Sequence, residues 1–301
     1  MPVGDSKNKS TITNVQKTER RWFVIATKQK LGLALGSGSA WGLAHVGVLQ
    51  ALEDEKIAID CICGSSMGAV IGGIYAAGTD VDMLAKVIPT LDARKYFDMV
   101  NPKKGGLLRG QRFQELIRLF TKNRTFSETD IPFSCVAVDI ENVELVILNA
   151  PTMRVDEAIR ASMSIPGVFQ PYTLDGRLLV DGGVLSRVPL TPLRSMDVDI
   201  VIGVDVGYRK DQNAKMAKPE TLIDFVFAAT DIMSWEMAKR DEENADVMIY
   251  PTVSDCDRNS FSDAQKAICA GYEAAMAAMP QIRKGLEKKK KKSSKKKIEK
   301  K

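Results

Sequence analysis

Short apolar runs alternate along the chain with longer segments in which apolar residues recur every three or four positions. Residues 31–35 (LGLAL) and 59–63 are apolar runs of the kind that form buried strands. Residues 43–55 and 67–77 have apolar positions at helical spacing, and each follows one of these runs. The order strand, helix, strand, helix predicts an α/β domain with a largely parallel sheet.

The same alternation continues through the rest of the chain. We expect further helices near residues 81–91, 111–121, 155–163, 225–239 and 263–284. We expect further strands near residues 133–139, 145–148, 178–180, 200–204 and 247–250. No internal repeat and no linker-like stretch interrupts residues 31–283, so the sequence predicts a single domain over that range.

The two ends of the 301-residue chain differ in charge from its middle. The formal net charge is +5, yet residues 284–301 contain 11 Lys against two Glu, and residues 1–30 contain seven Lys or Arg against two acidic residues. The middle is therefore acidic, which disfavours a basic nucleic-acid-binding domain. We expect a polar, basic N-terminal extension over residues 1–30 and a disordered Lys-rich tail over residues 284–301.

Sequence features that insert proteins into membranes or export them are missing. No apolar run approaches the roughly 20 residues that span a bilayer. The first residues lack the apolar segment of a secretory signal. The five Cys form no paired CxxC clusters, which favours buried free thiols over a zinc site. We therefore expect a cytoplasmic protein.

Residues 64–68 read Gly-Ser-Ser-Met-Gly, a G-x-S-x-G pattern between an expected strand and an expected helix. Small residues at Gly64 and Gly68 suit a sharp turn that pushes the Ser66 hydroxyl outward, and the following helix directs its positive end toward negative charge. An ordinary glycine-rich turn is the alternative interpretation. Ser65 is the weaker candidate because it occupies the second position of the pattern, so the context favours Ser66 as a nucleophile.

A serine nucleophile needs a base that takes its proton. His45 is the only histidine of the chain, and its place inside an expected helix favours a structural role. Asp181 ends an expected apolar strand and precedes Gly182 and Gly183, which let the backbone come close to another group. Asp-Gly-Gly is also common turn chemistry, so spacing alone makes Asp181 only a candidate base.

Residues 36–42 (Gly-Ser-Gly-Ser-Ala-Trp-Gly) connect the first expected strand to the first expected helix. Small residues in such a loop leave backbone N–H groups free to hold the oxyanion of an acyl-transfer reaction. A dinucleotide-binding G-x-G-x-x-G loop is the alternative. It is the weaker one, because Trp41 stands where that pattern needs its third Gly and the next strand leads to Ser66 rather than to an acidic residue.

Four blocks in a fixed order resemble the patatin-like phospholipase family, and specifically its compact prokaryotic members. The blocks are residues 33–38 with 42–49, then 64–68, 160–169 and 180–183. The resemblance extends from about residue 31 to about residue 280. Four ordered blocks are more specific than any single motif among them.

The resemblance implies a three-layer α/β/α fold with a mostly parallel central sheet and a serine acyl hydrolase that cleaves carboxylic esters of lipids. It implies a Ser-Asp dyad without a catalytic histidine, in which Ser66 forms the acyl-enzyme and Asp181 is the base. It implies no metal and no organic cofactor. The oxyanion hole implied consists of Gly36, Ser37, Gly38 and Ser39, and the supports of the elbow and the dyad loop are Gly64, Gly68, Gly182 and Gly183.

Trp41 departs from the family pattern, which usually has Arg or Lys at this place. Loss of that cation removes a partner for a phosphate headgroup, which favours neutral glycerides, lysolipids or simple acyl esters as substrates. The alternative function is a catalytically weak patatin-like scaffold that binds lipid or membrane. Residues 89–110 mix apolar side chains with Lys-Lys-Gly-Gly, as either a mobile cover over the site or an ordinary surface connection would.

The Lys-rich tail has two interpretations of its own. It is a solubilising end, or it holds the protein at the inner face of an anionic membrane, where each Lys contributes about 1 kcal/mol. Nucleic acid would attract the same lysines without sequence specificity. The expected partners are therefore a lipid or acyl ester substrate and an anionic membrane, and no specific nucleic acid.

Overall fold

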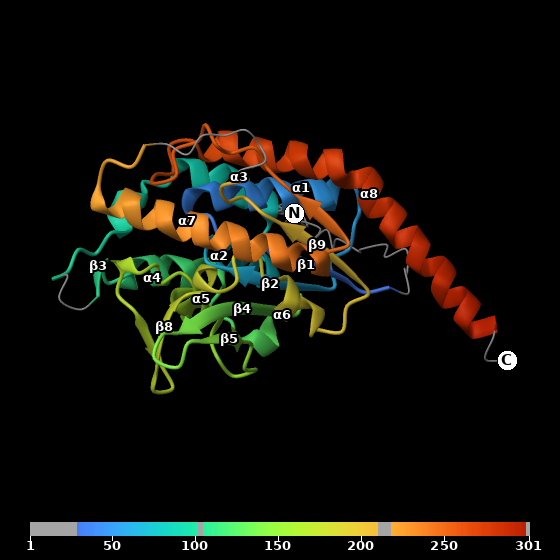
Figure 1. Ribbon diagram of the computed structural model, residues 1–301, viewed down its shortest axis with the longest axis horizontal. Helices are drawn as coiled ribbons and strands as arrows, with labels where there is room; N and C mark the ends of the chain where they lie inside the picture. Colours follow the sequence, from blue (N-terminus) through green and yellow to red (C-terminus); the bar gives the residue numbers. More distant parts are fainter. Residues whose placement is uncertain (1–28, 102–104, 210–217, 299–301) are drawn as a thin grey trace, which may run out of the picture.

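The computed structural model describes residues 29–101, 105–209 and 218–298. Its centre is an eight-stranded sheet in the order β10-β9-β1-β2-β4-β8-β7, with β5 also paired to β4 (Figure 1). A separate two-stranded sheet joins β3 to β6. The strands are β1 (Leu31–Leu35), β2 (Cys61–Ser65), β3 (Gly106–Leu108), β4 (Phe133–Asp139), β5 (Glu144–Leu148), β6 (Gly167–Phe169), β7 (Tyr172–Leu174), β8 (Arg177–Asp181), β9 (Ile200–Val204) and β10 (Val247–Ile249).

The middle of the sheet is parallel, and its strands are buried on both faces. Neighbouring strands from β10 to β4 run parallel, whereas β8 and β5 run antiparallel to β4. In β1, Leu33 and Leu35 enter a large hydrophobic cluster, and Ala34 enters a smaller one on the opposite face. Because both faces are covered, these strands appear in the sequence as continuous apolar runs.

Helices cover both faces of the sheet, which confirms the expected three-layer α/β/α fold. Helices α1, α2 and α8 contribute to the large cluster, and α8 packs along α1 (Figure 1). Helix α6 covers the small cluster. The helices are α1 (Ala44–Asp54), α2 (Met67–Ala76), α3 (Val81–Val87), α4 (Gln111–Phe120), α5 (Val155–Ser162), α6 (Leu190–Arg194), α7 (Leu222–Asp241) and α8 (Ala264–Ile298).

The ends of the chain differ in part from the sequence expectation. Helix α8 continues through Ile298, so the prediction of a disordered tail is wrong for residues 284–298. Lys and Glu are good helix formers, and they extend a helix whose earlier turns are fixed by packing against α1. Residues 1–28, which make up most of the expected N-terminal extension, and residues 299–301 lie outside the described residues.

Two further expectations concern membrane spans and cysteines. Across the described ranges, no helix is both long and apolar enough to cross a membrane. All five Cys are free thiols, and four of them are buried as expected, whereas Cys269 is exposed. Burial raises the pKa of Cys63 to about 12, which keeps this thiol protonated and unreactive.

Candidate active site

Ser66 lies in a tight turn between the end of β2 and the start of α2. Its φ angle is 53°, in the left-handed region that residues with a side chain seldom adopt. A Cβ atom on Gly68 would lie 2.0 Å from the Leu35 carbonyl oxygen, and one on Gly64 would lie 2.4 Å from the Ala69 Cα. Packing therefore requires glycine at both positions, which explains the G-x-S-x-G spacing.

Asp181 lies next to this turn because β2 and β8 share one edge of β4. Strand β4 pairs with β2 up to Val136 and with β8 from Ala137 onward. Strand β5 pairs along the opposite edge of the same residues. The C-terminal ends of β2 and β8 thus meet at adjacent residues of β4. Ser66 follows the end of β2, and Asp181 is the last residue of β8.

The Asp181 carboxyl group is buried, and burial raises its pKa from 3.8 to about 6. Its Oδ1 accepts a hydrogen bond of 2.7 Å from the Gly183 N–H. Its Oδ2 has no hydrogen-bond partner in the described part of the chain, although the nearby Ser66 hydroxyl lowers the pKa somewhat. This carboxyl group is mostly ionised at neutral pH and has an oxygen free to accept a proton.

The glycines after Asp181 allow the close approaches that the sequence suggested. A Cβ atom on Gly182 would lie 2.3 Å from the Val136 carbonyl oxygen of β4. One on Gly183 would lie 2.7 Å from the Ser37 Oγ, which belongs to the loop after β1. The loop that follows β8 therefore packs directly against the loop that follows β1.

The loop after β1 has two pairs of backbone N–H groups with different surroundings. The Gly36 N–H donates to the Val204 carbonyl oxygen at 3.0 Å, and the Ser37 N–H donates to the Arg187 carbonyl oxygen at 2.8 Å. The N–H groups of Gly38 and Ser39 donate to no residue that the structure describes. Of the four residues expected to form the oxyanion hole, Gly36 and Ser37 anchor the loop, and Gly38 and Ser39 have free donors.

His45 supports this loop from below, which matches the structural role expected for it. The side chain is fully buried in α1, and its Nε2 shares a hydrogen bond of 2.8 Å with the Gly36 carbonyl oxygen. Burial lowers the pKa of His45 to about 4, so the ring is neutral at physiological pH.

Residues at the end of α5 hold the backbone of both candidate dyad residues. The Ser66 N–H donates to the Ser162 Oγ at 3.0 Å, and the Asp181 N–H donates to the Ser164 carbonyl oxygen at 3.0 Å. Arg160 in turn donates from Nη1 to the Ser164 Oγ at 2.7 Å. The sequence analysis assigned these residues no role, and the only signal for them was their position within the 160–169 block.

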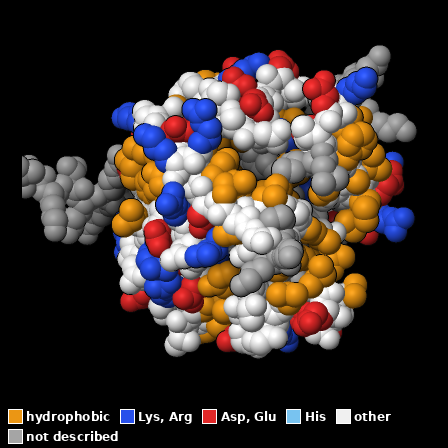
Figure 2. Space-filling model, turned by 90° about the vertical axis from the view of Figure 1, so that its left-hand side faces the viewer, with side chains coloured by type: hydrophobic (Ala, Val, Ile, Leu, Met, Phe, Trp, Pro, Cys, Tyr) orange, Lys and Arg blue, Asp and Glu red, His pale blue; other side chains and the backbone are white. Residues whose placement is uncertain are grey.

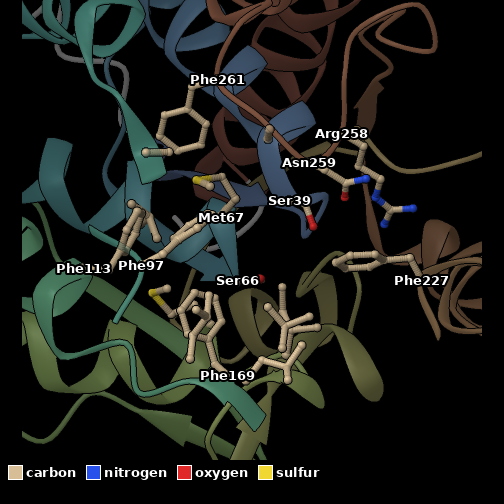
Figure 3. A pocket seen from close by; sticks show the side chains of 18 of the residues that line it. Ser39, Ser66, Met67, Phe97, Phe113, Phe169, Phe227, Arg258, Asn259 and Phe261 are labelled. Carbon is tan, nitrogen blue, oxygen red and sulfur yellow. The ribbon is translucent and has the colours of Figure 1, made fainter. Parts of the chain in front are cut away.

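A cavity of about 590 Å³ lies beside Ser66, and most of its lining is apolar. Figure 3 shows Ser66 between Phe97 and Phe113 on one side and Phe227 and Arg258 on the other. Phe97 belongs to residues 89–110, which therefore form part of the cavity wall. The apolar lining residues include Met67, Val70, Phe97, Met99, Leu107, Leu108, Phe113, Met163, Ile165, Val168, Phe169, Phe227 and Phe261.

Trp41 braces the loop after β1 and places a cation beside the cavity. Its Nε1 donates to the Cys256 carbonyl oxygen at 2.9 Å, and its ring lies 4.9 Å from the Arg258 guanidinium. Arg258 lines the cavity and forms an ion pair with Asp231 of α7. The sequence analysis expected this end of the site to lack a cation, but Arg258 supplies one from a distant part of the chain.

A family model described as patatin-like phospholipase matches residues 33–194, from β1 to α6. The matched range contains Ser66, Asp181 and the loop after β1. The chain belongs to the patatin-like phospholipase family. This confirms the family that the four sequence blocks indicated.

Curated relatives within this family align over the same part of the chain. An NTE family protein of Mycobacterium tuberculosis is 36% identical over 203 residues, which cover 67% of this chain and 56% of the relative. The lysophospholipase NTE1 of Cryptococcus neoformans is 32% identical over 201 residues, which cover 62% of this chain and 12% of the relative. This patatin-like chain thus spans little more than half the length of the first of these proteins.

Solved structures share the fold at low sequence identity. VipD from Legionella pneumophila superposes with a TM-score of 0.57 at 15% identity, over 86% of this chain and 67% of VipD. The type III effector protein ExoU superposes with a TM-score of 0.51 at 13% identity, over 86% of this chain and 53% of ExoU. At such identities the likeness concerns the patatin-like fold alone.

Proposed function

We propose that this patatin-like protein hydrolyses carboxylic esters of lipids through a Ser66-Asp181 dyad. One observation carries the proposal: a buried carboxylate with a free Oδ2 lies beside a serine on a strained turn, at the wall of an apolar cavity. Family membership and the lysophospholipase name of a relative agree with it. The reaction draws on this chain's own side chains and on water.

In the first half of the reaction, Asp181 Oδ2 accepts the Ser66 hydroxyl proton while the Ser66 Oγ attacks the ester carbonyl carbon. The carbonyl π electrons move to its oxygen, and the N–H groups of Gly38 and Ser39 stabilise that oxyanion. The N-terminal end of α2 adds a favourable field. When the tetrahedral intermediate collapses, the alkoxide leaves and takes the proton from Asp181, which produces the acyl-enzyme.

In the second half, water replaces the departed alcohol. Asp181 accepts a proton from that water as its oxygen attacks the acyl carbon, and the same two N–H groups hold the second oxyanion. Collapse breaks the bond to the Ser66 Oγ, which regains the proton from Asp181. The products are the free fatty acid and the regenerated enzyme, so one carboxylate serves both halves.

The cavity favours esters with a single long acyl chain. Its volume of about 590 Å³ lies in the range of pockets that enclose one medium-sized ligand. Aromatic and aliphatic side chains surround the space on the Phe113 side of Ser66, whereas Asp224 and Arg258 lie among the lining residues from α7 and the segment before α8. We propose that the acyl chain occupies the first region and that the alcohol part of the ester points toward the second.

Covalent labelling tests the proposal directly. A fluorophosphonate probe should label the native protein, and peptide mapping should place the adduct on Ser66, because only an activated serine attacks such a probe at an appreciable rate. Heat-unfolded protein is the control and should remain unlabelled. An adduct on any other serine would refute the assignment.

A lipid-binding scaffold without activity is the alternative function, and it rested on Trp41. The contacts of Trp41 with Cys256 and Arg258 give this residue a structural role beside the loop, so its presence does not argue against catalysis. A folded protein that the probe leaves unlabelled, and that still binds fatty acyl chains, would favour the scaffold.

We also propose a cytoplasmic location at the inner face of a membrane. The five Cys are free thiols, as is usual in a reducing compartment. Residues 284–301 carry 11 Lys, which anionic lipids attract. Sedimentation with anionic vesicles measures this contact, and added salt should weaken it because ions screen exposed charges.

A further inference from the structure

Helix α7 is apolar on its outer side as well as on its inner side. Phe225 is 60% exposed, Ile232 is 58% exposed and Met233 is 67% exposed, and Ala229 is also exposed. Their spacing of four, three and one residues places them on one face of the helix. We call these four residues the outer stripe. Helices at a protein surface ordinarily turn charged or polar side chains outward, so the stripe is unusual.

The inner side of α7 attaches the helix to the active site. Phe227 lines the cavity beside Ser66. Asp231 is buried and forms an ion pair with Arg258, whose carbonyl oxygen accepts a hydrogen bond of 3.2 Å from the Ala40 N–H in the loop after β1. These contacts fix the position of the outer stripe relative to the cavity.

Other exposed apolar residues lie at the cavity itself. Phe97 is 38% exposed and Met99 is 70% exposed, and both line the cavity. Figure 2, which views the end of the molecule that carries β3, shows groups of hydrophobic side chains around the middle of this face. Apolar surface thus continues from the cavity lining to the exterior, and α7 contributes to both.

We propose that the outer stripe of α7 docks onto a lipid surface, a bilayer or a micelle, from which the substrate enters the cavity. The inference rests on the proposed lipid ester hydrolysis. Asp231 is the only charged residue between Phe225 and Trp235, and it is turned inward. A face without charge matches the acyl region of a lipid interface, into which amphipathic helices insert Phe, Ile and Met side chains.

This contact differs in chemistry from the attraction expected of the Lys-rich tail. The tail would respond to anionic headgroups and to salt. The outer stripe would respond to accessible acyl chains and would bind neutral lipid at high salt. Vesicles of pure phosphatidylcholine in about 0.15 M salt therefore report on the stripe, since they carry no net charge and screening is strong.

The test compares two double variants in a Ser66→Ala protein, which leaves the vesicles intact. Ile232→Glu with Met233→Glu puts two charges on the stripe, and neither residue is among the described residues that line the cavity. The matched control is Ile140→Glu with Val143→Glu, at two exposed apolar positions of the β4–β5 turn. The stripe variant should need at least about tenfold more lipid for half-maximal sedimentation, because charges resist transfer into the interface. The control should bind like its parent.

Activity assays in the Ser66 background add a second readout. The stripe variant should hydrolyse a short monomeric ester such as p-nitrophenyl butyrate at the parental rate, and should lose most of its activity toward esters embedded in vesicles. Equal vesicle binding by parent, stripe variant and control would overturn the proposal, as would a parent that ignores neutral vesicles. A parent dimer that the stripe substitutions dissociate, with no vesicle binding, would overturn it too and assign the stripe to a second copy of the chain.

Failure of the proposed function is distinguishable from failure of docking. Vesicle sedimentation requires no catalysis, so it can succeed in a protein that hydrolyses nothing. Stripe-dependent binding without ester hydrolysis would refute the dyad proposal and support docking. Hydrolysis of monomeric ester without stripe-dependent binding would do the reverse.

Discussion

Replacing Ser66 by Ala is expected to lower kcat for a monomeric acyl ester by at least about 10⁴-fold. Loss of a catalytic serine removes the covalent path altogether, and only the oxyanion donors and the bound geometry continue to act on water. A factor of 10⁴ corresponds to roughly 5.5 kcal/mol of transition-state stabilisation. Initial rates with p-nitrophenyl butyrate, taken beside a melting curve that shows the variant is folded, measure the effect.

Ser65 provides the matched control for this substitution. Its hydroxyl is buried one residue earlier in the chain and has no hydrogen-bond partner in the part that the structure describes. Ser65→Ala removes an unsatisfied polar group and should keep nearly native activity and an equal or higher melting temperature. Activity that survives in Ser66→Ala and disappears in Ser65→Ala would exchange the roles of the two serines.

The sequence predicted the nucleophile well because a local constraint writes itself into local spacing. The turn at Ser66 excludes a Cβ atom at Gly64 and Gly68, and the same exclusion produces the G-x-S-x-G pattern. The central strands were equally visible, since burial on both faces yields uninterrupted apolar runs. Asp181 was only a candidate until the family resemblance gave it a role.

Contacts between distant segments were beyond the reach of pattern and spacing. Nothing in the residues around Asp181 says that β8 continues along the edge of β4 where β2 ends. Nor does Trp41 indicate that Arg258 will lie against its ring. Both depend on strand register and loop packing, which many residues determine together.

Helix α7 illustrates a different limit. Helical spacing predicted the segment itself, but apolar residues on both sides of a helix do not say which side faces the core. Burial of Asp231 and Trp235 answers that question and leaves Ile232 and Met233 outside. The Lys-rich tail was misjudged for the related reason that composition favours solvation and helix formation alike.

The activity of the native enzyme should depend on pH through Asp181. Burial raises the pKa of this carboxyl to about 6, and the proposed base works only when ionised. We expect kcat/KM to be constant at neutral pH and to fall about tenfold for each pH unit below about 6. His45, with a pKa of about 4, should not add a second transition in that range. A profile without any fall between pH 7 and pH 5 would argue against a carboxylate base.

Replacing Asp181 by Asn should lower kcat by about 10³-fold or more, because the amide cannot accept the Ser66 proton. The variant should not be less stable than the native enzyme. A pKa of about 6 against 3.8 means that ionisation of the buried carboxyl destabilises the native fold at pH 7.5 by roughly 3 kcal/mol. That stability is present while the group is protonated at low pH, and it is lost as pH rises through about 6. Because Asn is neutral at every pH, Asp181→Asn should melt at or above the native temperature at pH 7.5. A merely structural aspartate would show the opposite pattern, with a lower melting temperature and an activity loss no larger than the fraction unfolded.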